Sequence, residues 1–178
     1  MSITRVLRNV ALASTLVVPV VAASAPAEAA TLRPATCTPN WTIEGVGQEV
    51  YGHDEYGRQL SVGEVFQQYD YCQHVRGVFE WESSFRTQSH YGIAGAYADV
   101  SIGSSNASGS SGTVGSGAGG VVLTPNLAVD SLEWTSSVKV TLDYTTGVNA
   151  SCTAVAATWD YHDGGQVGAG HTCSMVFQ

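Results

Sequence analysis

The stretch Val138-Lys139-Val140-Thr141-Leu142-Asp143-Tyr144 alternates apolar and polar residues without a break. Successive side chains of a β-strand point to opposite faces, so strict alternation is typical of a strand with one face in a core and the other in solvent. The stretch therefore predicts a half-buried strand. It also indicates that the fold contains a β-sheet with one face in a core.

The same alternation, or a short apolar run, predicts further strands over residues 41–46, 78–85, 96–102, 121–123, 152–159 and 172–177. Many short strands with turn-rich connections predict an all-β chain, either an antiparallel β-sandwich or a distorted barrel. One short helix is predicted over residues 61–69, because Ser61 and Glu64 match a capping box and apolar residues follow at helical spacing. A strand that continues into Tyr71 is the alternative.

The first residues have the features of a secretory signal peptide. Arg5 and Arg8 precede an apolar run from Val10 to Ala25, which is short for a membrane span. The small-x-small site Ala27-Glu28-Ala29 predicts a signal peptide over residues 1–29 and a single secreted β domain over residues 30–178, with no membrane span in the mature chain. A leader retained as an N-terminal anchor is the alternative.

Charge narrows the range of partners. The chain carries 7 Lys and Arg against 15 Asp and Glu, and without residues 1–29 five basic and fourteen acidic residues remain, a net charge of −9. So acidic a chain lacks the basic surface that nucleic acids and anionic lipids require. Extracellular location and acidity together argue against nucleic acid as a partner.

The mature region holds four cysteines, Cys37, Cys72, Cys152 and Cys173. An even number in an exported chain predicts two disulfides, and of the three possible pairings we expect the sequential one. A symmetric hairpin loop over residues 162–171 would separate Cys152 from Cys173, so the loop is offset or the bridge joins non-neighbouring strands. Since no pair is spaced as C-x-x-C, the cysteines predict no metal site. No motif in the chain points to a cofactor.

Residues 103–120 are almost all Gly, Ser and other small residues. Such a segment cannot fill a core and is costly to order. We expect a flexible loop between strands; a linker between two halves of the chain is the alternative.

Two acidic clusters are candidates for catalysis. Glu80 and Glu82 would share one face of the strand predicted over residues 78–85, as the acid and the nucleophile or base of a glycosidase do. Asp160 and His162 lie near Asp163 and His171, where a carboxylate could orient a histidine base. For both clusters the alternative is an ordinary polar surface, a solvated strand face in the first case and a turn in the second.

Aromatic residues are the remaining signal for binding, since their faces can stack on sugars or contact protein. Five tyrosines are predicted as exposed contact residues: Tyr51, Tyr56, Tyr69, Tyr71 and Tyr91. The four tryptophans are expected in the core. The segment His53-Asp54-Glu55, flanked by Gly52 and Gly57, is expected to be a surface turn.

These observations favour a secreted, non-catalytic β-sandwich that binds an extracellular polysaccharide or protein. A small secreted glycosidase-like hydrolase is one alternative. A secreted protease inhibitor is another, disfavoured because its most obvious loop, residues 103–120, would have to be ordered on binding.

Overall fold

The computed structural model describes residues 37–105, 108–110, 114–116, 119–129 and 133–175. β9 (Glu133–Tyr144) shows why the chain forms strands: every second residue from Trp134 to Tyr144 is buried and the residues between them are not. The strand predicted over residues 138–144 is confirmed and begins five residues earlier. The predicted signal peptide, residues 1–29, lies outside the described residues.

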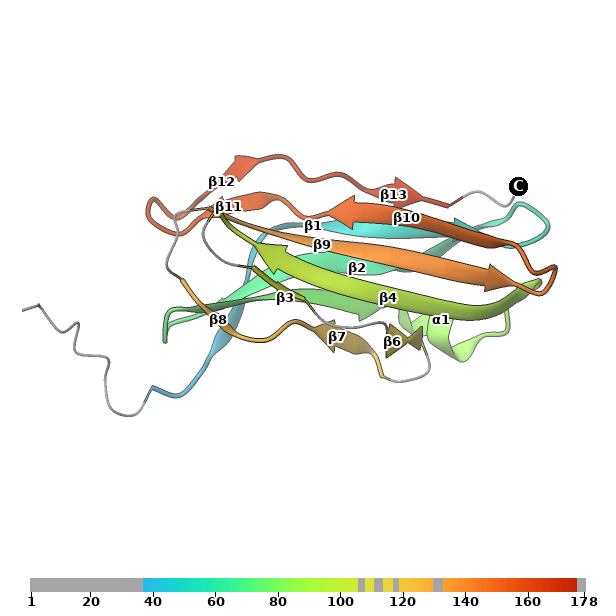
Figure 1. Cartoon of the computed structure of the whole chain (residues 1–178), viewed down its shortest axis with the longest axis horizontal. Helices are drawn as coiled ribbons and strands as arrows, with labels where there is room; N and C mark the ends of the chain where they lie inside the picture. The colour runs from blue at the N-terminus through green and yellow to red at the C-terminus, as the bar shows by residue number, and fades with distance from the viewer. Residues whose placement is uncertain (1–36, 106–107, 111–113, 117–118, 130–132, 176–178) are drawn as a thin grey trace, which may run out of the picture. The chain divides into compact units, whose positions relative to one another are not determined.

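The described strands form two sheets that face each other (Figure 1). The first sheet has the order β13 (Cys173–Ser174), β1 (Trp41–His53), β2 (Gln59–Asp70), β3 (His74–Trp81) and β7 (Val121–Leu123), and β8 (Leu127–Ala128) also pairs with β3. The second has the order β12 (Gly165–Gly168), β11 (Thr158–Asp160), β9, β4 (Ile93–Gly103) and β5 (Ser108–Ser110). β10 (Asn149–Val155) pairs with β9 and β6 (Val114–Gly115) with β4.

Neighbouring strands are antiparallel except β1 and β13, which are parallel. The predicted antiparallel sandwich is therefore confirmed, and the described strands do not close into a barrel. Each sheet contains strands from both sides of residues 103–120, so the described strands do not divide into two halves joined by a linker.

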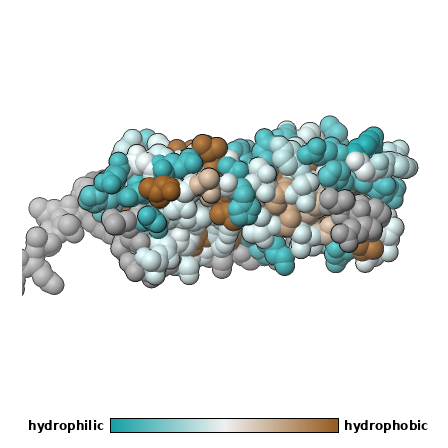
Figure 2. Space-filling view, turned by 90° about the horizontal axis from the view of Figure 1, so that it is seen from above, coloured by the Kyte–Doolittle hydropathy of each residue, from teal (hydrophilic) through white to brown (hydrophobic). Residues whose placement is uncertain are grey.

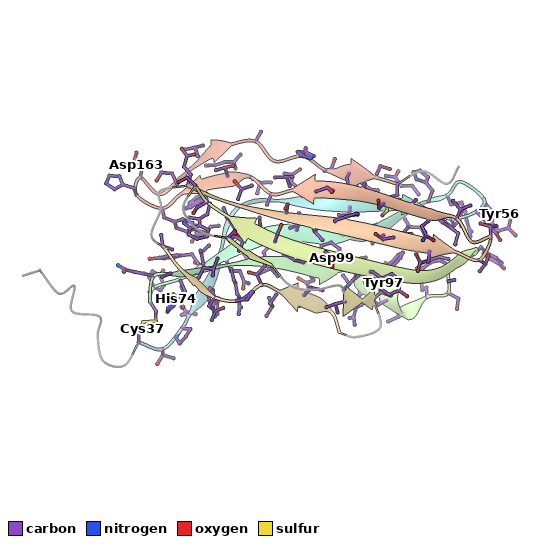
Figure 3. All side chains as sticks on the ribbon, viewed as in Figure 1. Cys37, Tyr56, His74, Tyr97, Asp99 and Asp163 are labelled. Carbon is purple, nitrogen blue, oxygen red and sulfur yellow. A yellow bond between two sulfur atoms is a disulfide. The ribbon has the colours of Figure 1, made fainter. Side chains whose placement is uncertain are left out.

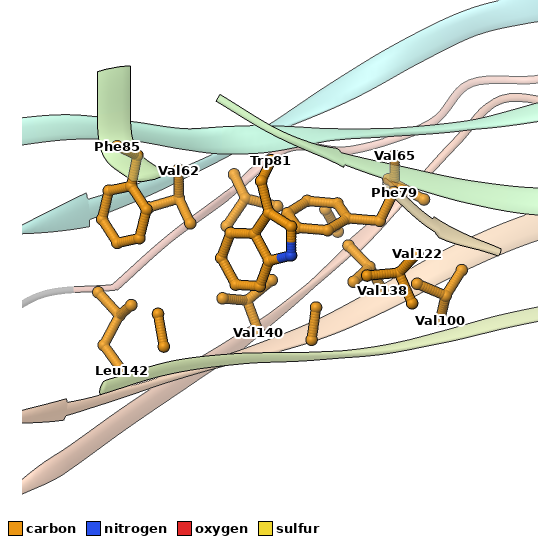
Figure 4. Close-up of a cluster of buried hydrophobic side chains, with 14 of the residues drawn as sticks. Val62, Val65, Phe79, Trp81, Phe85, Val100, Val122, Val138, Val140 and Leu142 are labelled. Atoms are coloured by element: carbon orange, nitrogen blue, oxygen red, sulfur yellow. The ribbon is translucent and has the colours of Figure 1, made fainter. Parts of the chain in front are cut away.

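The core lies between the two sheets (Figure 4). Phe79 and Trp81 of β3 are almost fully buried and meet edge to face, with ring centroids 4.9 Å apart. Val140 and Leu142 of β9 belong to the same cluster. Burial of a large apolar side chain stabilises a fold by about 1.5–3 kcal/mol, so this cluster carries much of the stability of the sandwich.

Both disulfides have the predicted sequential pairing, Cys37–Cys72 and Cys152–Cys173. Cys152 lies on β10 of the second sheet and Cys173 on β13 of the first, so this bridge joins the sheets to each other. The hairpin between β11 and β12 turns between Asp160 and Gly165. Both predicted geometries therefore occur: the hairpin loop is offset from residues 162–171, and the bridge joins strands that are not neighbours.

The helix predicted over residues 61–69 is wrong, because β2 occupies this segment. β2 pairs with β1 on one side and β3 on the other. Opposite β1 the register shifts between Ser61 and Gly63, which leaves Val62 as an extra residue. This bulge puts Val62 and Val65 on the same buried face three residues apart, a spacing that imitates a helix.

Two other segments differ from the prediction. The strand predicted over residues 78–85 ends at Trp81, and α1 (Ser83–Thr87) follows. Within the segment predicted to be a loop, residues 103–120, β5 and β6 both pair with β4, so it is not a loop throughout. The closing strand, predicted over residues 172–177, is the short β13.

Candidate functional site

The five tyrosines predicted as contact residues do not form one surface. Tyr56, in the turn between β1 and β2, contacts Tyr91 of the loop before β4. Tyr69 and Tyr71 form a second pair, where β2 turns into β3. Tyr51 lies on β1. In Figure 3 the labels Tyr56 and His74 mark these two ends of the sheets. Both tyrosines of the first pair are exposed, whereas only Tyr71 is exposed in the second.

The turn between β1 and β2 is built on the buried carboxylate of Asp54, which is 1% exposed. One oxygen accepts hydrogen bonds from the backbone N–H groups of Tyr56 (3.0 Å) and Arg58 (2.9 Å), and the other accepts from Arg58 Nε (2.6 Å). Burial alone would raise the pKa of Asp54, but these hydrogen bonds and the charge of Arg58 outweigh it and lower the pKa. Gly57 supplies the positive φ of 73° that closes the turn.

Above this turn lies a group of three exposed side chains, Tyr56, Arg58 and Tyr91, which we call the tip. The tyrosine rings meet edge to face, with centroids 5.2 Å apart and planes at 63°. The Arg58 guanidinium carbon lies 5.7 Å from each ring centroid. Tyr56 is 67% exposed and Tyr91 58% exposed, so the tip presents two aromatic rings to solvent around a fixed cation.

The loop that carries Tyr91 is attached to both the turn and the core. Glu55 N donates to Tyr91 O at 3.3 Å, which joins the two loops of the tip. His90 stacks on Phe85 with ring centroids 4.6 Å apart and donates from Nε2 to Phe85 O at 2.9 Å. Phe85 in turn stacks on Trp81. Aromatic contacts therefore run from the core to His90, the residue that precedes Tyr91 in the chain.

At the other end of β2, the turn into β3 uses a second buried carboxylate, Asp70. It accepts from His74 N at 2.8 Å and from His74 Nδ1 at 3.1 Å. The Cys37–Cys72 disulfide ties this turn to the segment before β1. Tyr71 is 72% exposed and touches Tyr69 edge to face at a centroid distance of 6.4 Å. This end has one exposed aromatic ring where the tip has two.

The tryptophans are only partly in the core. Trp81 and Trp134 are buried as predicted. Trp41 and Trp159 are half-buried, and Arg76 lies over the ring of Trp41 at 3.9 Å. Trp41 is half-buried and its cation lies closer than Arg58 lies to either tip ring, so this ring is a weaker candidate for a contact surface than the exposed tyrosines of the tip.

The structure places Glu80 and Glu82 on different elements. Glu80 is on β3 and faces outward, whereas Glu82 is the N-cap of α1, where its carboxylate accepts from Ser84 N at 3.4 Å. The prediction that both share one strand face is therefore wrong for Glu82. A spacing of two residues would put both glutamates on one face of a strand, but β3 ends at Trp81, one residue before Glu82.

Glu80 instead belongs to a line of carboxylates across three strands. Glu64 of β2 lies directly opposite Glu80 of β3 and also opposite Glu49 of β1. We call Glu49, Glu64 and Glu80 the carboxylate row. Together with Glu82 and Arg86 they line a hollow of about 290 Å³. Sequence reasoning missed Glu49 and Glu64, because only the strand register brings them to Glu80.

The carboxylate row is electrostatically crowded. Partial burial and the charges of Glu49 and Glu80 raise the pKa of Glu64. Tyr51, next to the row on β1, donates its hydroxyl hydrogen bond to the Glu49 carboxylate. This bond, burial and the charge of Glu49 raise the pKa of Tyr51. Tyr51 thus supports the row instead of joining either tyrosine pair.

The Asp160 carboxylate meets His162 at its backbone, and the ring of His162 has another partner. Asp160 Oδ1 accepts the backbone N–H of His162 at 2.7 Å, as expected of a turn residue. The ring of His162 donates from Nδ1 to Asp163 Oδ1 at 2.8 Å, and this contact raises the pKa of His162. His171 lies apart, in a bridge with Val155. Both His162 and Asp163 are exposed, so these residues form a polar turn.

Among the residues that the structure describes, no three His, Cys, Asp or Glu side chains are arranged to hold a metal ion. The same part of the chain has no helix long and apolar enough to cross a membrane. Figure 2 shows the hydrophobic side chains of one face as small groups separated by hydrophilic ones. That face therefore offers no broad apolar patch.

The fold defines the class of protein: a disulfide-bonded antiparallel β-sandwich with a rigid aromatic tip beside a row of carboxylates. Comparison with protein-family models, with curated proteins and with solved structures found no match to this chain. The function must therefore be argued from the site itself.

Proposed function

We propose that this chain is a secreted, non-catalytic β-sandwich protein that binds an extracellular polysaccharide or protein through its tip. The observation that carries the proposal is the exposure of Tyr56 and Tyr91 on loops held by the buried Asp54. Rigid aromatic side chains supply contact area at little entropic cost, since few rotamers are lost on binding. The predicted leader and the two disulfides support the extracellular location.

The test compares the two ends of β2. A Tyr56→Ala/Tyr91→Ala double variant should reduce binding to an extracellular polymer at least tenfold, as loss of central aromatic contacts does. Tyr71→Ala, an equally exposed tyrosine at the other end, is the matched control and should change binding less than twofold. The measurement is the bound fraction on cellulose, chitin, xylan and peptidoglycan. Binding that the double variant leaves intact would contradict the proposal.

A glycosidase-like hydrolase is the second candidate, now at Glu64 and Glu80 in place of Glu80 and Glu82. The observation that favours it is that Glu64 and Glu80 lie directly opposite each other on neighbouring strands, where partial burial and nearby charges raise the pKa of Glu64. Reducing-sugar release from the same polymers should then be lost in Glu64→Gln and Glu80→Gln but kept in Glu133→Gln. Activity equal in all three variants would exclude this site.

The protease inhibitor gains no support from the tip. Tyr56 sits in a turn closed by the hydrogen bond from Gly57 N to Asp54 O at 2.9 Å. A closed turn does not offer the extended segment that a protease cleft pairs with along its edge.

A further inference from the structure

The tip and the carboxylate row lie at the same end of the first sheet. On β1, the residues Glu49, Tyr51 and His53 alternate with buried Val50 and Gly52, so they follow one another along the outward face. This line leads from the carboxylate row to the turn that carries Tyr56. Tyr51 lies on this line and donates its hydroxyl hydrogen bond to the Glu49 carboxylate.

The surface around the tip is acidic. In the described part of the chain, none of Glu49, Glu64 and Glu80 forms an ion pair with a Lys, Arg or His. The charge of Arg58 is offset by Asp54 at 2.6 Å. The tip therefore presents aromatic rings with little net charge, at the same end of the first sheet as three carboxylates that form no ion pair among the described residues, with Arg86 lining the same hollow.

From this juxtaposition we infer that the tip docks a cationic segment of another protein, one that presents arginine side chains. This inference rests on the proposed binding function. Guanidinium groups stack on tyrosine faces and form charge-assisted hydrogen bonds with carboxylates, so both neighbouring features recognise the same chemical group. The long-range field of an acidic chain also steers a cationic partner toward it.

A neutral polysaccharide fits the same surface less well. The two tyrosine rings are inclined at 63°, so they offer no common plane on which consecutive sugar rings could stack. Carboxylates add no charge complementarity toward a neutral chain. Tyrosine and arginine together are instead the residue types that dominate the binding energy of protein interfaces.

The probe is a fluorescent oligoarginine peptide, titrated against the oxidised mature protein at low and physiological ionic strength. We expect Tyr56→Leu/Tyr91→Leu to weaken binding about tenfold, because two cation–π contacts are lost. Glu49→Gln/Glu64→Gln/Glu80→Gln should weaken it by a similar factor. The controls carry the same changes at the other end: Tyr71→Leu, and Glu133→Gln/Asp160→Asn/Asp163→Asn.

If the two charge triples weaken binding equally, or the tip variant has no effect, the peptide senses only net charge and the inference is wrong. If the peptide does not bind, but a polysaccharide binds to wild type and not to the Tyr56/Tyr91 variant, the inference is also wrong. The proposed function then stands. If neither peptide nor polysaccharide responds to the tip variant, both fail. Circular dichroism of each variant verifies the fold.

Discussion

The two turns at the ends of β2 are each stabilised by a buried aspartate, but the residue that hydrogen-bonds to the aspartate differs. In each, a fully buried aspartate accepts the backbone N–H and a side-chain N–H of the residue four positions later. The partner of Asp54 is Arg58 and the partner of Asp70 is His74. Arginine keeps its charge at every physiological pH, whereas histidine is the residue type that changes charge in this range.

The second difference is covalent. The Cys37–Cys72 disulfide has one cysteine within the turn of Asp70, whereas the Cys152–Cys173 disulfide reaches β1 only opposite Val50 and has no cysteine in the turn of Asp54. The tip therefore depends on a permanent ion pair and on aromatic stacking for its rigidity. The same motif, a buried aspartate that accepts N–H groups of its turn, therefore holds an exposed pair of tyrosines at one end of β2 and a disulfide-linked turn at the other.

The largest expected effect comes from removal of either buried carboxylate. Asp54→Ala and Asp70→Ala each leave several N–H donors without an acceptor, so Tm should fall on the order of 5–10 °C. The fall should be larger for Asp54→Ala, because no disulfide holds its turn. Thermal unfolding of the oxidised protein measures this, with Asp163→Ala at an exposed turn as the control. A larger fall for Asp70→Ala would contradict the comparison.

A double-variant cycle tests how far the disulfide supports the second turn. In a Cys37→Ser/Cys72→Ser background, Asp70→Ala should cost a few degrees of Tm more than in the native background, since residues in one network are not additive. Asp54→Ala, at the distant turn, should cost about the same in both backgrounds. Equal costs for Asp70→Ala with and without the disulfide would show that the two features act independently.

Acid unfolding tests how much Arg58 contributes to the stability of the ionised Asp54 carboxylate. The lowered pKa of Asp54 means that its stabilising contribution is complete above the ordinary aspartate pKa and is lost as pH falls through the lower folded value. Arg58→Gln removes the guanidinium hydrogen bond and charge that help lower this pKa, while the backbone N–H donors at residues 56 and 58 remain. We expect the acid-unfolding midpoint to rise by roughly half a pH unit. A midpoint unchanged from wild type would show that Arg58 does not stabilise the ionised carboxylate.

Much of the fold could be predicted from local patterns. Alternation along residues 138–144 indicates a strand because it depends only on neighbouring residues. Four cysteines after a predicted leader indicated two disulfides, but the sequential pairing was only one of three that the sequence allowed. β2 was misread as a helix because the bulge at Val62 is a property of pairing with β1, which the sequence of β2 alone does not show.

The candidate site was predictable only in part. Tyr56 and Tyr91 were named as contact residues, but their proximity depends on two loops that are far apart in the chain. Asp54 looked like a surface turn residue, because a buried carboxylate and an exposed one have the same sequence signature. The carboxylate row was missed since strand register is set by long-range pairing.

The smallest expected effect lies on β2 between the two turns. Glu64 differs from Asp54 and Asp70 in that carboxylates, not N–H donors, are its neighbours, and its pKa is raised. A raised folded pKa means that ionisation opposes folding: the penalty is present at neutral pH and vanishes as pH falls below the ordinary glutamate value of about 4.3. Glu64→Gln should therefore stabilise the protein, whereas Asp54→Ala destabilises it.

Because Glu64 is largely exposed, solvent screens most of this repulsion, and the gain in Tm at neutral pH should be no more than about 2 °C. Thermal unfolding of wild type and Glu64→Gln across a pH series should show the two curves converge at low pH. Glu133→Gln, which lies outside the carboxylate row, controls for the change in net charge. A Glu64→Gln variant less stable than wild type at neutral pH would mean that the ionised carboxylate has a stabilising partner, and the contrast between the row and the two buried aspartates would not hold.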